Sequence, residues 1–185
     1  MPKEMQPEKQ KETQWFVMRD LTRPNALNPA WTRMKEEGFE VFTPLTWRMS
    51  RKGGRSVKCR VPVIHDLLFI RSTREELDPK VERIPTLQYR YAKGGGYCQP
   101  MVVAEREMEN FILAVGQNDD PKFYAPSEVS ESMIGRKVRI MGGALRGFEG
   151  NLLSVKGMRK KRLIVELAGM LTAAVEIQKE YIEFI

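Results

Sequence analysis

The chain has 185 residues, enough for one domain of ordinary size or two small ones. It carries 31 Lys and Arg against 24 Asp and Glu, for a formal net charge of +7, and 42% of its residues are hydrophobic, which argues against a wholly disordered chain. No run approaches the roughly 20 apolar residues of a membrane span, and the amino terminus lacks the apolar core of a signal peptide. These features favour a binding protein of the reducing cytoplasm that makes no membrane contact.

Residue types that carry catalysis or bind metals are scarce. The two cysteines cannot form a disulfide framework or a thiolate metal site, and there is a single histidine. His65 stands beside Asp66, but no nucleophile or metal ligand accompanies the pair, so a histidine in a turn is the favoured interpretation. We therefore expect no catalytic residue, no metal site and no cofactor.

The first third of the chain predicts a tail, two strands and a helix. Residues 1–13 show balanced charge, two prolines and no periodicity, which is typical of a disordered tail. A strand is expected over 14–19. A helix follows, for which Asn28-Pro29 is the start signal and Gly38 the stop signal. A second strand is expected over 39–45.

The segment from Arg48 to Arg60 predicts a basic β-hairpin with a loose tip at Gly53-Gly54. It contains no acid and six cations: Arg48, Arg51, Lys52, Arg55, Lys58 and Arg60. Because these charges repel one another, a polyanion such as nucleic acid would stabilise the hairpin, mainly through phosphate contacts. A solvated loop is the alternative that charge alone leaves open.

A strand over 66–71 has apolar side chains on both faces, with Leu68 and Ile70 on one and Leu67 and Phe69 on the other. Either both faces are covered or one is a docking patch, and we favour docking slightly. Thr73 and Glu76 have the spacing of a capping box that opens a helix ending near residue 83.

The rest of the chain predicts a further strand and helix, a linker and a small barrel. A strand is expected over 86–91, a turn over 94–96 and a helix over 104–115, with one face formed by Met108, Phe111, Ile112 and Val115. Residues 117–132 are polar and contain two prolines, as expected of a linker. The period then changes to two, which predicts five short strands and an SH3-like barrel over 133–185. The predicted fold class is α+β, with an α/β domain over 14–116 in front of the barrel.

Two groups of residues resemble a known family. The run Gly135-x-x-Val138-x-Ile140-x-Gly142-Gly143-x-Leu145-x-Gly147-x-Glu149-Gly150 resembles the KOW motif. The segments before it resemble the NusG amino-terminal domain: Trp15-Phe-Val-Met, Gly38-Phe-Glu-Val-Phe-x-Pro44, the basic hairpin, Pro62-x-x-x-x-Leu67-Leu-Phe-Ile70 and Ile84-Pro85. The expected KOW positions are Gly135, Val138, Ile140, Gly143, Leu145, Gly147 and Gly150. The glycines at 142, 143, 147 and 150 are expected to permit the positive φ that a tight turn between strands requires.

The resemblance implies a transcription elongation factor that binds RNA polymerase. In the family, the amino-terminal domain docks on the clamp helices of the largest subunit, and the matching residues are Ile64, Leu67 and Phe69; relatives often have an aromatic residue where this chain has Leu67. The docked domain lies near the upstream fork and the non-template DNA, which suits a basic hairpin, and nascent RNA is a further possible ligand. A factor that bridges the clamp would favour its closed state and reduce pausing.

The layout is also similar to the specialised UpxY-type paralogues, which act as antiterminators on polysaccharide operons. In the family, the KOW domain recruits Rho or a ribosomal protein, but the matching stretch from Val165 to Leu171 lacks the aromatic residue usual in NusG. This absence argues against either contact. The alternative function is an RNA- or ribosome-binding KOW protein, for which the basic run Arg159-Lys-Lys-Arg162 would be required.

Overall fold

The computed structural model describes residues 12–24, 26–92, 99–119 and 121–185. Its backbone contacts divide the chain into two compact units, residues 1–102 and 103–185. The tail predicted over 1–13 lies outside the described residues apart from its last two positions, and the turn predicted over 94–96 lies wholly outside them.

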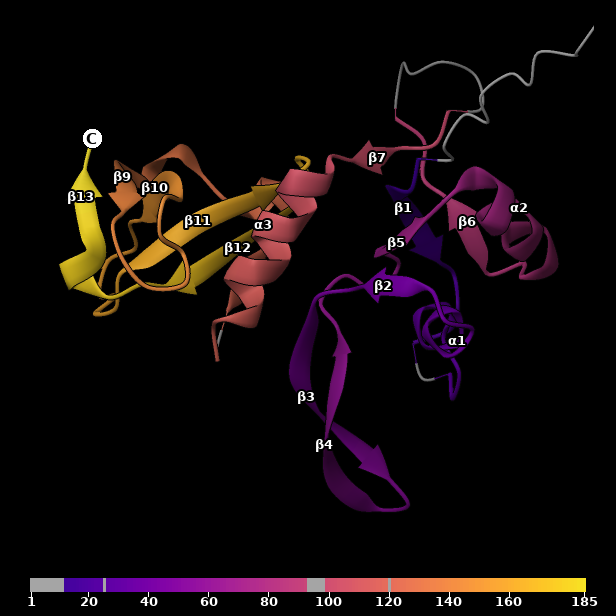
Figure 1. The fold of residues 1–185 in the computed structure, drawn as a ribbon. Helices are drawn as coiled ribbons and strands as arrows, with labels where there is room; N and C mark the ends of the chain where they lie inside the picture. The colour runs from indigo at the N-terminus through magenta and orange to yellow at the C-terminus, as the bar shows by residue number, and fades with distance from the viewer. Residues whose placement is uncertain (1–11, 25, 93–98, 120) are drawn as a thin grey trace, which may run out of the picture. The chain divides into compact units, whose positions relative to one another are not determined.

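The first unit is built on an antiparallel sheet (Figure 1). The strand order is β2 (Glu40–Phe42), β5 (Leu68–Ser72), β1 (Gln14–Asp20) and β6 (Leu87–Tyr89), and β7 (Val102–Val103) also pairs with β1. The central pair, β1 and β5, runs from Gln14 opposite Ser72 to Met18 opposite Leu68. Both strands contain a continuous run of apolar residues instead of an alternation of apolar and polar ones. Such a run is typical of a strand that is buried on both faces.

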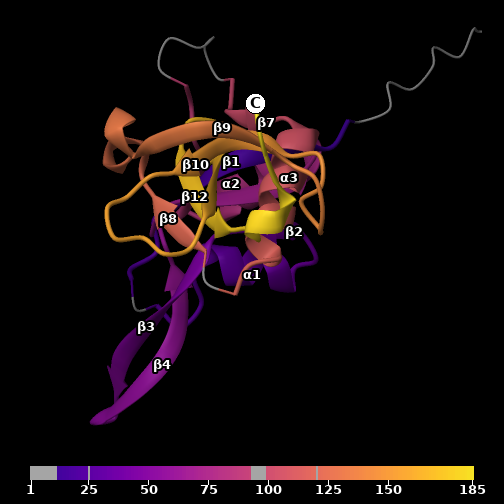
Figure 2. The same cartoon turned by 90° about the vertical axis from the view of Figure 1, so that its left-hand side faces the viewer.

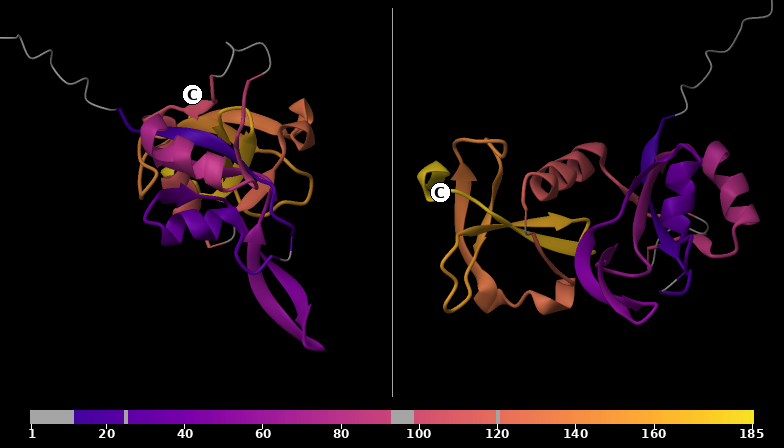
Figure 3. Two further views of the ribbon diagram at one scale, coloured as in Figure 1. Left: turned by 90° about the vertical axis from the view of Figure 1, so that its right-hand side faces the viewer. Right: turned by 90° about the horizontal axis from the view of Figure 1, so that it is seen from below.

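Two helices cover one face of this sheet (Figure 3). They are α1 (Ala30–Glu36) and α2 (Arg74–Arg83). The core between helices and sheet consists of Phe16, Met18, Ala30, Met34, Leu68, Ile70, Leu77, Ile84, Leu87 and Tyr89. Burial of each such side chain contributes about 1.5 to 3 kcal/mol, so this layer is the main stabilising element of the unit.

Local hydrogen bonds explain where the two helices begin. Thr73 caps α2, since its hydroxyl accepts a hydrogen bond from the Glu76 amide at 3.3 Å, as the predicted capping box requires. In a full capping box the Glu76 carboxylate would accept from the Thr73 amide, but here it accepts from the Ser72 hydroxyl at 2.9 Å. The cap residue of α1 is Pro29 rather than the predicted Asn28. In the first turn of this helix, the Trp31 amide donates to the buried carboxylate of Asp20 at 3.3 Å.

The basic segment forms the predicted hairpin, and it extends away from the sheet of the first unit (Figures 1 and 2). Its strands, β3 (Leu45–Lys52) and β4 (Arg55–Pro62), pair only with each other among the described residues. The tip is a tight two-residue turn rather than a loose loop. Gly53 and Gly54 both have positive φ angles, +56° and +77°, as in the type I′ turns that suit the twist of a hairpin.

The second unit contains one sheet of short strands. The strand order is β13 (Ile182–Phe184), β9 (Ile134–Ile140), β10 (Glu149–Leu153), β11 (Arg162–Leu167), β12 (Leu171–Glu176) and β8 (Lys122–Tyr124). Short 3₁₀ turns lie at Pro126–Glu128, Glu131–Met133 and Lys179–Tyr181. The α+β class predicted from the sequence is therefore confirmed: an antiparallel sheet with helices is followed by an all-β part.

Helix α3 (Glu105–Gly116) belongs by its contacts to the second unit, where it packs on β11 and β12. The Glu107 carboxylate accepts a hydrogen bond from the Ala168 amide in the turn between those strands, and the Asn118 amide group donates to the Glu176 carbonyl at 3.1 Å. The sequence instead assigns this helix to the amino-terminal domain. The predicted linker over 117–132 also contains β8, which pairs with β12. A polar, proline-containing composition does not reveal that an open strand edge lies nearby.

Candidate functional site

The β3–β4 hairpin displays its cations in an open arrangement. Arg48, Arg51, Arg55, Lys58 and Arg60 are all exposed. Cross-strand pairing places three of the six cations on each face of the ribbon, at positions 51, 58 and 60 on one and 48, 52 and 55 on the other. Arg48, Arg51, Arg55, Lys58 and Arg60 form no ion pair within the described parts of the chain. The hairpin therefore presents an uncompensated positive charge on both faces.

An exposed tryptophan lies among these cations. Trp47 is 57% exposed, and it stands opposite Arg60 in the register. The Lys58 ammonium lies 4.9 Å from the centre of the indole ring and the Arg60 guanidinium 5.6 Å, both within cation–π range. The sequence-based site residues did not include Trp47. An aromatic residue directly before Arg48, the first cation of the basic segment, was the sequence signal that could have identified it.

The residues expected to dock on a partner lie at and before β5. Ile64 is half-buried, whereas Leu67 is 1% exposed and Phe69 is fully buried, with its ring centre 6.2 Å from that of Phe42. Leu68 and Ile70, on the opposite face of the strand, are fully buried as well. Of the two interpretations of this doubly apolar strand, the structure therefore shows coverage on both faces. A role of Ile64, Leu67 and Phe69 in docking remains a prediction.

The KOW residues of the second unit have two structural roles. Val138, Ile140 and Leu145 are buried. Gly143 and Gly147 have φ angles of +72° and +87° in the connection between β9 and β10, as predicted.

The other glycines of this motif are required by close contacts rather than by positive φ. A Cβ atom on Gly135 would lie 2.8 Å from the Leu152 carbonyl oxygen, and one on Gly150 would lie 3.0 Å from the Ile164 carbonyl oxygen. A Cβ on Gly142 would lie 2.6 Å from the Tyr181 ring. The expectation of a positive φ at positions 142 and 150 is therefore wrong, because at these positions the backbone itself is close to its neighbours.

Comparison with known proteins decides the family. The family model described as NusG, transcription termination factor nusG, matches residues 13–112, which is more than half of the chain. The chain belongs to the NusG family. Membership makes it a transcription factor rather than an enzyme, and the family implies RNA polymerase as a partner.

A solved NusG structure has the same fold. It is described as "Domain interaction in Thermotoga maritima NusG", it is 18% identical, and the similarity covers 94% of this chain and 98% of that one with a TM-score of 0.52. No curated protein matches the chain. The NusG family model ends inside α3, whereas the contacts of the structure divide the chain before that helix. The domain bounds drawn from the sequence therefore remain a prediction.

The remaining sequence candidates have structural explanations within this NusG-type fold. The Asp66 carboxylate does not orient His65; it accepts from the guanidinium groups of Arg19 at 3.1 Å and Arg90 at 3.3 Å. No cluster of metal-ligating side chains occurs among the described residues. No helix in the described ranges is long and apolar enough to cross a membrane.

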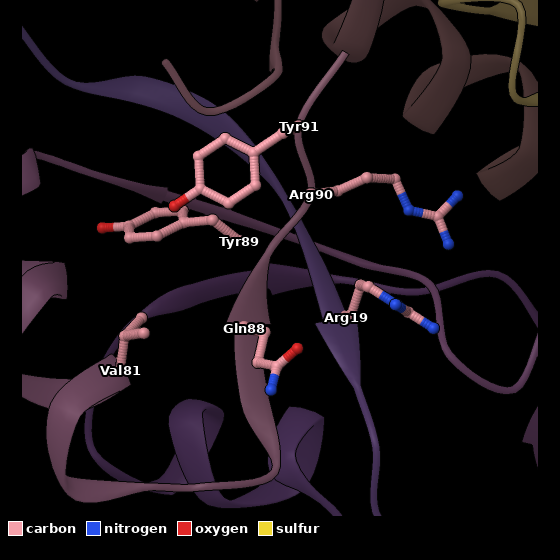
Figure 4. Close-up of a pocket in the computed structure, with 6 residues that line it drawn as sticks. All are labelled: Arg19, Val81, Gln88, Tyr89, Arg90 and Tyr91. Carbon is pink, nitrogen blue, oxygen red and sulfur yellow. The ribbon is translucent and has the colours of Figure 1, made fainter. Parts of the chain in front are cut away.

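A pocket in the first unit is lined in part by Arg19 and Arg90 (Figure 4), the two arginines that pair with Asp66. Its lining residues are Arg19, Val81, Gln88, Tyr89, Arg90 and Tyr91. Burial and a hydrogen bond to Asp78 raise the pKa of Tyr89, so this phenol stays protonated, and both arginines are already paired with Asp66. Neither arginine of the pocket is therefore a free cation, and the Tyr89 phenol is no proton donor or acceptor for catalysis.

Two features of the second unit bear on partners. In the basic run at 159–162, Lys160 forms a 2.7 Å ion pair with Glu176, and Arg162 is 7% exposed with its guanidinium donating to the Ala174 carbonyl. Half of that run is thus occupied by contacts within the unit. The stretch from Val165 to Leu171 contains the end of β11, the turn and the first residue of β12, and Leu167 and Leu171 in it are fully buried.

Proposed function

We propose that this chain is a transcription elongation and antitermination factor that binds RNA polymerase on the clamp helices of its largest subunit. It would act in the cytoplasm, bridge the DNA channel and suppress pausing or termination. The observation that carries the proposal is the match of residues 13–112 to the NusG family model. The exposed basic hairpin supports it, because an uncompensated ribbon of cations suits a site beside the non-template DNA near the upstream fork.

The mechanism is a shift between two states of the polymerase. A protein that contacts both sides of the cleft binds the closed clamp more tightly than the open one. A differential of about 1 to 3 kcal/mol would bias the equilibrium by about 5- to 150-fold, which is enough to reduce pausing without any covalent step.

The burial of Leu67 and Phe69 restricts how a partner could dock on this face. A partner reaches these two side chains only after the face that carries them is uncovered, whereas the half-buried Ile64 is in part accessible as the structure stands. Phe69→Asp would place a charge in the core and test folding rather than docking. Ile64 is therefore the residue with which to test this face.

We further propose that this chain is a UpxY-type paralogue that acts on polysaccharide operons. Loss of the Rho contact would suit an antiterminator, and the stretch from Val165 to Leu171 supports such a loss because it contains no aromatic residue. A polysaccharide gene cluster directly downstream of the gene is the expected genomic context. A pull-down in which purified Rho bound this chain as well as it binds a housekeeping NusG would contradict the assignment.

The alternative is an RNA- or ribosome-binding KOW protein, with nascent RNA as one ligand. The basic run at 159–162 gives it less support than the sequence alone would, because Lys160 and Arg162 already have partners within the unit. It predicts salt-sensitive RNA binding that is lost in Arg159→Ala/Lys161→Ala, with no polymerase bound.

The functional test is transcription in vitro with purified polymerase on a template that contains a pause site and a terminator. We expect the chain to shorten the pause and increase read-through. An unchanged pause and unchanged read-through at saturating protein would contradict the proposed function.

A further inference from the structure

The two faces of the β3–β4 hairpin differ in kind although each carries three cations. The register places Trp47 opposite Arg60, Met49 opposite Lys58 and Arg51 opposite Ser56 on one face, which we call the Trp47 face. The opposite face carries Arg48, Ser50, Lys52, Arg55, Val57 and Cys59. Only the first of these faces has an aromatic ring.

The Trp47 face leaves a large apolar surface in water. Trp47 is 57% exposed and Met49 is 61% exposed, although the central strands β1 and β5 bury all of their large apolar residues. The two side chains are adjacent on one strand face, so they form a continuous apolar strip. Such exposure on a paired ribbon favours a partner that covers the strip.

The charges around the strip restrict what that partner can be. Lys58 and Arg60 lie within 5.6 Å of the indole centre, and Arg51 extends the row toward the tip of the hairpin. No acid occurs anywhere between Leu45 and Pro62. The site therefore combines an aromatic platform with flanking cations, which is the combination that binds single-stranded nucleic acids through stacked bases and contacted phosphates.

We propose that the Trp47 face is a stacking site for an unpaired base of single-stranded DNA. Trp47 stacks on the base, and Arg51, Lys58 and Arg60 contact the phosphates on either side of it. The strand must be unpaired because bases in a duplex already stack on their neighbours and expose no π-face. The proposal deepens the proposed function, since it rests on the hairpin lying beside the non-template strand.

This assignment separates two contributions to binding. The phosphate contacts depend on charge and salt but not on the bases, whereas the stacking contact requires a base and is largely independent of its identity. A variant at position 47 removes the second contribution and leaves the first.

The experiment measures binding of the full chain to a short oligodeoxythymidine and to an oligomer of equal length and charge with abasic sites, by fluorescence anisotropy at low salt. We expect the wild type to prefer the oligomer with bases by about 5- to 150-fold. Trp47→Ala should abolish that preference without weakening binding to the abasic oligomer. Trp47→Phe should restore part of the preference.

Two controls make the result specific. Val57→Ala, at a 42%-exposed apolar position on the opposite face, should keep the full preference. Lys58→Ala/Arg60→Ala should weaken binding to both oligomers and reduce the salt dependence. Because positions 47, 57, 58 and 60 are exposed, circular dichroism should show all variants folded.

Several outcomes would overturn the proposal. Equal affinity of the wild type for the two oligomers, a preference that survives Trp47→Ala, or a duplex bound as tightly as the single strand would each do so. Loss of binding to an acidic polypeptide in Trp47→Ala, with the base preference intact, would assign the face to a protein instead. If the base preference is found but no polymerase is bound, the stacking site stands and the proposed function fails; the reverse result overturns only the stacking site.

Discussion

The Tyr89 hydroxyl donates a 2.7 Å hydrogen bond to the Asp78 carboxylate, which joins the edge strand β6 to helix α2. The Arg74 guanidinium donates to the same oxygen at 2.9 Å and also lies 5.0 Å from the centre of the Tyr89 ring. Burial alone would raise the pKa of Asp78, but the hydrogen bonds from Arg74 and Tyr89 outweigh it and lower the pKa. This triad therefore fixes the helix against the sheet with an ionised carboxylate.

Removal of the Tyr89 hydroxyl should destabilise the first unit. Tyr89→Phe keeps the ring and its edge contact with Phe16 but leaves Asp78 without one donor. We expect a loss of about 1 kcal/mol in the free energy of unfolding, measured by chemical denaturation. Tyr91→Phe, at a 51%-exposed tyrosine, is the matched control and should change the stability little.

The ion pairs of Glu37 predict an acid-dependent stability. Glu37, directly after α1, pairs with Lys80 and Arg83 on α2, and hydrogen bonding by Lys80 outweighs burial and lowers its pKa below 4.5. A lowered folded pKa means that the contribution is complete above about pH 4.5 and is lost as the pH falls through the folded value.

Glu37→Gln should therefore reduce stability near neutral pH by about 0.2 to 1 kcal/mol per ion pair and flatten the loss of stability below pH 4.5. The measurement is thermal unfolding from about pH 3 to about pH 7, a range that includes the ordinary carboxyl pKa of 4.5. Glu36→Gln is the control, because Glu36 makes no ion pair among the described residues. Equal pH profiles for Glu37→Gln and the wild type would refute the assignment.

The close contact at Gly135 predicts a large cost for one added methyl group. Its Cβ would lie 2.8 Å from the Leu152 carbonyl oxygen, which is backbone of the paired strand β10 and cannot rotate away. Gly135→Ala should cost about 1 to 3 kcal/mol of unfolding free energy. The same change at Gly116, where a Cβ meets no atom within 4 Å, should be neutral or slightly stabilising.

A substitution at Ala168 should instead stabilise the second unit. Ala168 has a φ angle of +48° in the turn between β11 and β12, a conformation that costs an L-residue about 1 to 2 kcal/mol. Ala168→Gly relieves that strain and keeps the amide that donates to Glu107. We expect a higher midpoint of thermal unfolding, and a lower midpoint would show that the turn is not strained.

Much of the fold follows from local signals in the sequence. Gly53-Gly54 predicts the hairpin turn, the Thr73 cap predicts the start of α2, and the change of period after residue 133 predicts the short strands of the second unit. Each of these signals acts over a few neighbouring residues. They are therefore readable without knowledge of what packs where.

The features that the sequence did not predict depend on distant contacts. Asp20 follows the strand predicted over 14–19, and nothing in its local sequence indicates that its buried carboxylate accepts from the Trp31 amide at the start of α1. The amphipathic α3 has an apolar face, but periodicity cannot say which sheet covers it. Likewise, alternation along β5 shows that both faces are apolar without showing that both are buried. The cluster around the exposed Trp47 could not be predicted from its own strand, because its cation neighbours come from the opposite strand.

Gel filtration of the chain with purified RNA polymerase tests most directly whether the chain binds polymerase through the face that carries Ile64. We expect the wild type to co-elute with the polymerase and Ile64→Asp to co-elute at least tenfold less, an order-of-magnitude loss of about 1.4 kcal/mol or more. Leu27→Asp, which adds the same charge at a 97%-exposed residue, should bind as the wild type does. A folded wild-type chain that does not co-elute with polymerase would contradict the account, and co-elution of Ile64→Asp at the wild-type level would contradict the docking face.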